Sequence, residues 1–318
     1  MKKIILGRTN QEVSTISLGT WAHGGPNKAG GRGVGWGGHD DSLAQRALIL
    51  AWESGINHWD TADVYGNGHS EKLIGQTWNT VPRNDIFLAS KVGWDQGAYP
   101  HFYHPDQMRK QLENSLRLLK VDQLDLYYFH HCMFGKQEEY LGAAMETMLR
   151  FKDEGKIRFI GLSDWNLSKI MKVVDQINPD VIQPYRNVYD DAYGDSGLKN
   201  WVDTNQVGVV FFSPLRHGLL TGKYAGPAKF ESGDFRSTVP EFTDADFITR
   251  MQENKQMLKD RFPDHPQPVL YGLTGALLSD APTGCVLLGQ RNPDQVAAAA
   301  ALGEPLNEED SQWVFSLY

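Results

Sequence analysis

Four polar side chains in the first half of the chain could together protonate an oxygen atom: Asp60, Tyr65, Lys91 and His130. A free tyrosine has a pKa of about 10 and is a poor acid at neutral pH. A lysine beside the Tyr65 hydroxyl would stabilise the phenolate and lower that pKa, while a carboxylate would hold the lysine charged and in place. A histidine could donate a hydrogen bond to the same oxygen. Such a set suits proton delivery to an oxygen that gains negative charge, as in the reduction of a carbonyl group.

Asp60, Lys91 and His130 fall at the ends of short apolar runs, which we expect to be strands alternating with helices along the chain. Near-continuous apolar strands are typical of a parallel sheet covered on both faces, and eight of them suffice to close a barrel. The sequence therefore predicts an α/β fold, a (β/α)8 TIM barrel with strands at residues 16–20, 56–60, 86–92, 124–130, 159–164, 181–187, 207–214 and 285–289. Expected helices include residues 42–53, 105–119, 138–154, 167–177 and 293–302.

A β-hairpin at residues 2–6 and 12–14 is expected before the barrel, because a short polar turn joins the two segments. An open, doubly wound sheet is the alternative arrangement. The barrel is favoured because polar residues end almost every strand, as expected when the loops at one barrel face build one site. No stretch has the composition of a linker, so residues 1–318 are expected to form a single domain.

Two segments are longer than ordinary connections and are expected at the C-terminal face of the barrel, residues 22–40 and 221–243. Long loops of this kind are usually lids or binding loops. Residues 33–38 of the first loop read GVGWGG, which matches the GxGxxG pattern of dinucleotide-binding folds. This run does not directly follow a strand, so we interpret it as part of a flexible lid and not as a dinucleotide fingerprint.

The net charge, the cysteine count and the lack of long apolar runs argue against a nucleic-acid-binding, disulfide-rich or membrane protein. A net charge of -8 argues against non-specific binding of nucleic acid, which needs a concentrated basic face. Cys132 and Cys285 are too few for a disulfide framework and fit a reducing compartment. No apolar run reaches the roughly 18 residues of a membrane span, and no signal-peptide core follows Met1. We therefore expect a cytoplasmic protein without membrane or nucleic-acid partners.

Hydrolytic and metal-dependent chemistries fit the sequence less well. The GxSxG and HExxH patterns are absent. His130 and His131 are adjacent in an expected strand and point to opposite sides, so they cannot readily bind one metal ion. A barrel site built from Asp60, Asp63 and His130 stays open as an alternative, but we expect no metal.

Several longer stretches resemble the aldo-keto reductase superfamily, in the order in which they occur. They are WDTADVYG at 59–66, ASK at 89–91, LDLY at 124–127 before His130, GKIRFIGLS at 155–163, and SPL at 213–215 with GLLTGKY at 218–224. The last segment is similar to the prokaryotic and potassium-channel β-subunit branches. The resemblance implies a barrel that binds NADP(H) extended across its C-terminal face without a Rossmann motif.

The resemblance also implies a role for each matching position. Tyr65 would be the general acid and base, Lys91 and Asp60 its tuning pair, and His130 the orienting donor. Substrate would be bordered by Trp21, Tyr65, Trp94, His130, His131 and Trp165. Ordinary packing is the alternative for Trp21, Trp94, His131 and Trp165. The cofactor positions are Thr20, Trp21 and Asp60 beside the reacting ring, Ser163, Asp164 and Gln183 for the carboxamide, Phe212 stacked on the nicotinamide, Ser213, Leu215, Lys223 and Arg236 along ribose and pyrophosphate, and Gly289, Arg291 and Gln295 at the adenosine phosphate.

Two departures from the family pattern bear on the cofactor. Where many relatives have Ser-Asn, this chain has Ser163 and Asp164, which replaces an amide with an acceptor-only carboxylate. Ala298 and Ala299 stand where a Glu-Asn pair often contacts adenine. Arg291 favours a 2′-phosphate through a charge-assisted contact, so NADP(H) is expected and NAD(H) stays open.

The sequence therefore predicts an NADP(H)-dependent oxidoreductase that reduces an aldehyde or ketone, sugars and hydroxy-carbonyls among them, to an alcohol. The nicotinamide C4 would supply the hydride and Tyr65 the proton. A cofactor-binding regulatory subunit of the same fold is the second hypothesis; His130 favours the enzyme, because the channel subunits carry another residue there. A metal-dependent lyase or isomerase is the third. The physiological substrate, the direction of the reaction and the oligomeric state stay open.

Overall fold

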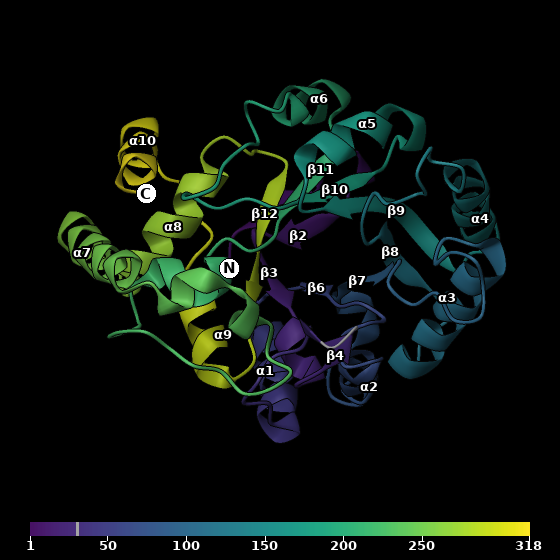
Figure 1. The fold of residues 1–318 in the computed structure, drawn as a ribbon, viewed down its shortest axis with the longest axis horizontal. Coiled ribbons are helices and arrows are strands. Elements are labelled where there is room, and N and C mark those ends of the chain that lie inside the picture. Colours follow the sequence, from purple (N-terminus) through teal and green to yellow (C-terminus); the bar gives the residue numbers. More distant parts are fainter. Residues whose placement is uncertain (30–31) are drawn as a thin grey trace.

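Within residues 1–29 and 32–318, which the computed structural model describes, eight parallel strands close into a barrel, as predicted (Figure 1). Around the barrel the order is β3, β6, β7, β8, β9, β10, β11 and β12, and β12 pairs with β3 to complete the circle. The strands are β3 (Ile16–Gly19), β6 (His58–Asp60), β7 (Phe87–Val92), β8 (Leu124–Phe129), β9 (Ile157–Asp164), β10 (Val181–Pro184), β11 (Gly208–Phe211) and β12 (Gly284–Gly289).

The predicted hairpin closes the N-terminal end of the barrel. Leu6 follows its first strand, is fully buried, and packs with inward-facing strand residues such as Val210. Arg8 donates its backbone N–H to the carbonyl of Gln206, just before β11 begins. The interior is thus shielded at the end opposite the strand C-termini. The hairpin consists of antiparallel β1 (Lys3–Ile5) and β2 (Glu12–Ser14), joined by the 3-10 helix η1 (Gly7–Thr9).

Helices cover the outside of the barrel, and the five predicted from the sequence are all present (Figure 1). The α-helices are α1 (Asp41–Glu53), α2 (His69–Gly75), α3 (Pro105–Leu119), α4 (Leu141–Asp153), α5 (Leu167–Ile177), α6 (Leu198–Asn205), α7 (Ala245–Arg261), α8 (Pro268–Leu278), α9 (Pro293–Ala300) and α10 (Glu308–Leu317). The shorter elements are η2 (Trp21–Gly24), β4 (Lys28–Ala29), β5 (Arg32–Gly33), η3 (Arg83–Asp85), η4 (Arg216–Thr221), η5 (Phe235–Thr238) and η6 (Pro240–Thr243).

Several element ends differ from the prediction by a few residues, and at two of them a residue has a positive φ. Helix α4 begins at Leu141 rather than residue 138, since Glu138 has a φ of 53°. Strand β11 ends at Phe211 rather than residue 214, since Ser213 has a φ of 56°. A left-handed backbone continues neither a helix nor a strand.

Helix α8 is an element that the sequence pattern did not reveal. Its residues from Gly272 to Leu278 are all buried, because it lies between α7 and α10 (Figure 1). A helix that is covered on all sides has no polar face, so its sequence shows no helical period. Although α8 is apolar, no helix in the described part of the chain is long and apolar enough to cross a membrane.

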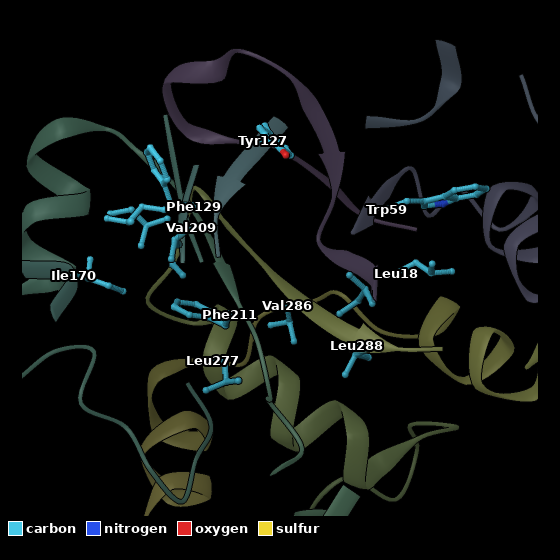
Figure 2. Packing of buried hydrophobic residues seen from close by; sticks show 14 of the residues in the cluster. Leu18, Trp59, Tyr127, Phe129, Ile170, Val209, Phe211, Leu277, Val286 and Leu288 are labelled. Carbon is cyan, nitrogen blue, oxygen red and sulfur yellow. The ribbon is translucent and has the colours of Figure 1, made fainter. Parts of the chain in front are cut away.

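Side chains along the strands alternate between the barrel interior and the layer beneath the helices. In β7, Phe87 and Ala89 belong to the interior cluster, whereas Leu88 belongs to the outer one. Figure 2 shows part of this outer layer, where Val209 and Phe211 lie near Ile170, Leu277 and Val286.

The same alternation brings two site residues to the barrel mouth. The next inward position of β7 after Ala89 is Lys91, and the inward series of β8 leads from Leu126 and Tyr128 to His130. Strands β7 and β8 pair in parallel, with Lys91 opposite Tyr128. The period that builds the core therefore also places the reactive groups.

A close contact between β8 and β9 gives a test of the interior packing. Gly161 pairs with Tyr128, and a Cβ on Gly161 would lie 2.2 Å from Cδ1 of the tyrosine. We expect Gly161→Ala to lower the free energy of unfolding by about 1–3 kcal/mol, the usual cost of overpacking a core, as measured by urea titration. Gly142→Ala on α4 is the matched control, because a Cβ there meets nothing within 4 Å. Equal stabilities of the two variants would contradict this packing.

Candidate active site

The ammonium group of Lys91 is the centre of the site. It donates hydrogen bonds to the Asp60 carboxylate, to the carbonyl oxygen of Thr61 at 2.8 Å and to the Tyr65 hydroxyl at 3.2 Å. Neighbouring strands β6 and β7 supply Asp60 and Lys91, and the loop after β6 supplies Tyr65. Three of the side chains that were predicted to act together are therefore in direct contact.

The charge on Lys91 is held by its partners. Burial lowers the pKa of Lys91, but the Asp60 carboxylate and the Tyr65 oxygen more than offset this, so the pKa lies above its usual value. The second Asp60 oxygen accepts a hydrogen bond from Nε2 of Gln183 at 2.9 Å. A metal ion at Asp60 would have to displace both contacts, which disfavours the metal-site alternative at this position.

The pKa of Tyr65 differs in direction from the prediction. Desolvation of the hydroxyl raises this pKa above its usual value, and the charge of Lys91 lowers it by less. The sequence identified the cation but could not reveal how far the hydroxyl is removed from water. Tyr65 therefore keeps its proton at neutral pH. A residue that acts as a proton donor needs this, because it must be protonated before the reaction begins.

His130 lies beside Tyr65 as a neutral imidazole. The two rings meet edge to face, with centroids 5.9 Å apart. Burial, and then the charges of Lys91 and His131, lower the pKa of His130 well below its usual range. Its buried Nδ1 has no hydrogen-bond partner among residues 1–29 and 32–318. The ring can donate one N–H to a neighbouring oxygen without adding a charge to the site.

A cavity of about 1200 Å³ opens over these residues at the C-terminal ends of the strands. Lys91 lies behind Tyr65 and is not part of its lining. Most of the residues that the sequence singled out do line it: Thr20, Trp21, Asp60, Tyr65, Trp94, His130, Ser163, Trp165, Gln183, Phe212, Ser213, Leu215, Lys223, Arg236, Gly289, Arg291 and Gln295.

Asp164 and His131 are placed beside the cavity but not on its lining. The two carboxylate oxygens of Asp164 accept backbone N–H groups from Cys132 at 2.7 Å and from Asn166 at 2.8 Å. Nε2 of His131 lies 2.6 Å from the carbonyl oxygen of Gly93. Both side chains are thus committed to fixing the turns after their strands.

Two exposed tryptophans form a wall of the cavity near Tyr65. Trp94 lies 5.9 Å from His130 and 6.2 Å from Trp165, and Trp165 lies 5.3 Å from Phe212, measured between ring centroids. Their side chains are 42% and 43% exposed, which is unusual for tryptophan away from binding sites. This wall offers flat apolar surface next to the proton donor.

The far end of the cavity is cationic. Lys223, Arg236 and Arg291 all line it. Burial lowers the pKa of Lys223, and the charges of the two arginines lower it further. Gln295, in the first turn of α9, accepts the backbone N–H of Arg291 at 2.9 Å. Converging cations next to a helix start form a surface suited to an anion such as a phosphate.

The two long loops join each other across the cavity. Phe235 donates its backbone N–H to the carbonyl of Gly35 at 2.9 Å, and Gly35 donates to Gly233 at 3.0 Å. The Asp234 carboxylate accepts the backbone N–H of Gly37 at 2.7 Å. A Cβ on Gly33 would lie 2.6 Å from the carbonyl oxygen of Asp234 in the facing loop. The glycines therefore permit close backbone approach between loops, which explains a GxGxxG match outside its usual strand-to-helix context.

Three aromatic residues of the lining were not predicted from the sequence: Trp36, His217 and Phe235. They surround Trp21, with ring centroids 5.4, 6.0 and 5.2 Å from it, respectively. All three lie in or next to the long loops. Their position in loops that were expected to cover the site was the one signal that could have identified them.

Comparison with known proteins agrees with this geometry. The model of the Aldo/keto reductase family matches residues 15–315. The chain belongs to the aldo/keto reductase family. It is therefore an oxidoreductase of the class that reduces carbonyl groups of small molecules with a nicotinamide cofactor, as the sequence motifs indicated.

Relatives of this aldo/keto reductase align over most of its length. It is 30% identical to the aldo-keto reductase YhdN of Bacillus subtilis over 98% of this chain and 92% of the relative. It is 31% identical to an NADH-specific methylglyoxal reductase of Escherichia coli over 70% of each chain. The structure of the glycerol dehydrogenase AKR11B4 from Gluconobacter oxydans superposes with a TM-score of 0.80 at 27% identity, covering 99% of this chain and 94% of the other.

Near Lys91, the aldo/keto reductase barrel holds a further buried acid that was not predicted. Glu71 of α2 accepts a hydrogen bond from the Ser90 hydroxyl at 2.7 Å. Its other oxygen has no partner within the described residues. Burial raises the pKa of Glu71 from 4.5 to about 7. The folded protein thus retains a proton that the unfolded chain has lost between these two values.

This linkage predicts a pH-dependent stability. The contribution of Glu71 is full below pH 4.5 and is lost as the pH rises through about 7. We expect Glu71→Gln, which mimics the protonated acid, to be more stable than wild type at pH 8 by about 1–3 kcal/mol, but equally stable at pH 4, below the unfolded pKa. Urea unfolding at the two pH values measures this. Glu146→Gln, at an exposed position of α4, is the control; a difference between wild type and Glu71→Gln that did not change with pH would overturn the assignment.

Proposed function

We propose that the protein is an NADP(H)-dependent reductase of an aldehyde or ketone in which Tyr65 supplies the proton. The observation that carries the proposal is the contact between a buried, charged Lys91 and the protonated Tyr65 hydroxyl at the wall of a large cavity. A proton donor needs a group that stabilises the anion left behind, and Lys91 is positioned for that purpose.

Each side chain has a distinct part in this proposal. Tyr65 gives its proton to the carbonyl oxygen as negative charge develops there. Lys91 remains charged and stabilises the phenolate through the contact of 3.2 Å. Neutral His130 donates a hydrogen bond to the same oxygen and orients the carbonyl group. Bound NADPH supplies the hydride to the carbonyl carbon.

The cavity lining supports a nicotinamide dinucleotide in an extended pose. Ser163 and Gln183 are neighbours on β9 and β10 and would hold the carboxamide, while Phe212 offers a ring for stacking. The carboxylate of Asp164 is already occupied by backbone N–H groups, so we assign it to positioning the turn rather than to the cofactor. The cationic end would receive the phosphates.

The phosphorylated cofactor is favoured by the charge of that end. Lys223 and Arg291 line that end, with Arg291 two residues before α9, and a 2′-phosphate there would gain charge-assisted contacts. Ala299 is buried in the core and offers no contact to adenine. One relative, from Escherichia coli, is named as NADH-specific, so family membership does not decide between NADP(H) and NAD(H). The proposed preference for NADP(H) therefore rests on the charged residues of this chain.

The role of Tyr65 is tested by Tyr65→Phe. We expect kcat/KM for carbonyl reduction to fall by about 10²–10⁴-fold, because the variant lacks the proton donor. Quenching of tryptophan fluorescence by NADPH should be unchanged. Tyr99→Phe, which removes a hydroxyl outside the cavity, is the control. Near-full turnover by Tyr65→Phe would refute the proposed mechanism.

The role of Arg291 is tested by comparing the two cofactors. We expect Arg291→Gln to raise the KM for NADPH by roughly 10–100-fold, the loss of one charge-assisted hydrogen bond, and to leave the KM for NADH nearly unchanged. Arg250→Gln on the exposed face of α7 is the charge-matched control. Arg291 also donates to the carbonyl of Gly37, so damage to the loop would raise both KM values equally and would contradict contact with a 2′-phosphate.

A further inference from the structure

Outside the cavity, two histidines converge on one carboxylate at the starts of α1 and α2. His39 ends the glycine-rich loop, Asp41 is the first residue of α1, and His69 is the first residue of α2. Nε2 of His69 lies 2.8 Å from Oδ1 of Asp41, and Nε2 of His39 contacts the same oxygen. One donor atom from each residue lies within 4.8 Å of the others.

We propose that His39, Asp41 and His69 bind one divalent transition-metal ion, with Zn²⁺ as the reference ion. Imidazole nitrogen and carboxylate oxygen are ligands that Zn²⁺ binds at about 2.0–2.2 Å, so that ligand atoms of a tetrahedral site lie roughly 3.3–3.5 Å apart. The three donor atoms need little movement to reach that separation.

The orientation of the rings also fits a metal ion. The imidazoles of His39 and His69 meet at 85° with centroids 5.3 Å apart, so their nitrogens approach the common point from different directions. The Asp41 side chain is 53% exposed, which leaves room for a water molecule as the fourth ligand. Without a metal ion, each Nε2 atom must carry a proton to donate to the shared oxygen. With a metal ion bound at both Nε2 atoms, each neutral imidazole would carry its proton on Nδ1 instead.

The local charge permits a cation despite the two helix starts. The N-terminal ends of α1 and α2 carry partial positive charge, which disfavours a metal ion. Asp41 and the neighbouring Asp40, the N-cap of α1, oppose it with two carboxylates. No pattern in the sequence indicated this cluster, because His69 lies 28 residues from Asp41 and the three residues follow no known zinc spacing.

A metal ion here would fasten the glycine-rich loop to the barrel. The loop residue Gly37, two positions before His39, accepts a hydrogen bond from Nη1 of Arg291 at 3.0 Å. His39, Asp41 and His69 do not line the cavity. The ion would therefore act on loop order next to the cationic end and would take no part in proton transfer.

The test is a titration of the full-length chain, prepared without an affinity tag and treated with chelator, with Zn²⁺ in a calorimeter and with Co²⁺ by its visible absorption. We expect one ion per chain and a rise in melting temperature with Zn²⁺. His39→Ala and His69→Ala should each weaken binding by at least about tenfold. Asp41→Asn keeps the shape of the side chain and one accepting oxygen but removes the negative charge, and should also weaken binding. His265→Ala, a histidine outside the cluster, should bind as wild type.

The outcomes separate this proposal from the proposed function. Absence of saturable binding to wild type, or equal binding by wild type and the three cluster variants, would overturn the metal site. Activity of the chelator-treated protein with a carbonyl substrate should persist, because the cluster lies outside the reaction centre. Complete loss of activity with chelator and its return with Zn²⁺ would place the ion in the reaction and contradict the structural role assigned here.

Discussion

The buried ion pair between Lys91 and Asp60 is the constraint on which the site depends. Removing two charges from water costs several kcal/mol per ion, and the pair is tolerated only because its remaining polar atoms are satisfied. Gln183 and the Thr61 carbonyl supply those partners, one from β10 across the barrel and one from the end of β6. The hydroxyl of Tyr65 completes the shell of the ammonium group. If these strands moved apart, a buried charge would lose its partners. The closed barrel therefore holds the polar groups together, and their contacts in turn favour the closed barrel.

The ionisation of its neighbours matters as much as the ion pair. Glu71 and His130 both lie near Lys91, and ionisation of either would change the charge balance of the site. Burial lowers the pKa of His130 well below its usual range, so its imidazole is neutral at neutral pH. Burial raises the pKa of Glu71 only to about 7, so this acid is half ionised at pH 7 and fully protonated only at lower pH. The raised pKa of Tyr65 keeps its proton in place, and the contact with the charged Lys91 stabilises the phenolate that forms when the proton leaves.

Patterns along the chain predicted the barrel and most of the cavity. Each apolar run indicated a strand, and the polar residue at its end indicated a residue of the cavity. The alternation that buries Phe87 and Ala89 also directs Lys91 inward, so one pattern located a strand and a functional residue together. Depth of burial is a property of the folded state, and the direction of the Tyr65 pKa was therefore missed. The contacts of Asp164 could not be predicted for a related reason: a carboxylate can accept from a ligand or from backbone N–H groups, and the folded turns supply two such N–H groups here. Helix α8 was not predicted because burial of its residues from Gly272 to Leu278 leaves that part without a polar face and so without a helical period.

The two ends of the cavity impose different kinds of recognition. Near Tyr65 the cavity wall is aromatic. The indole N–H of Trp21 is already donated to the carbonyl of Val34 at 3.0 Å, so this wall would recognise a substrate more by its shape than by hydrogen bonds. At the other end Arg236 pairs with Asp234, and that same carboxylate holds Gly37 of the facing loop. An anion that binds Arg236 competes with Asp234 for it and so acts on the contact between the loops. Because coupling of this kind is reciprocal, loosening the loop contact must change affinity for the anion, whereas the barrel strands that hold Lys91 and Asp60 need not move.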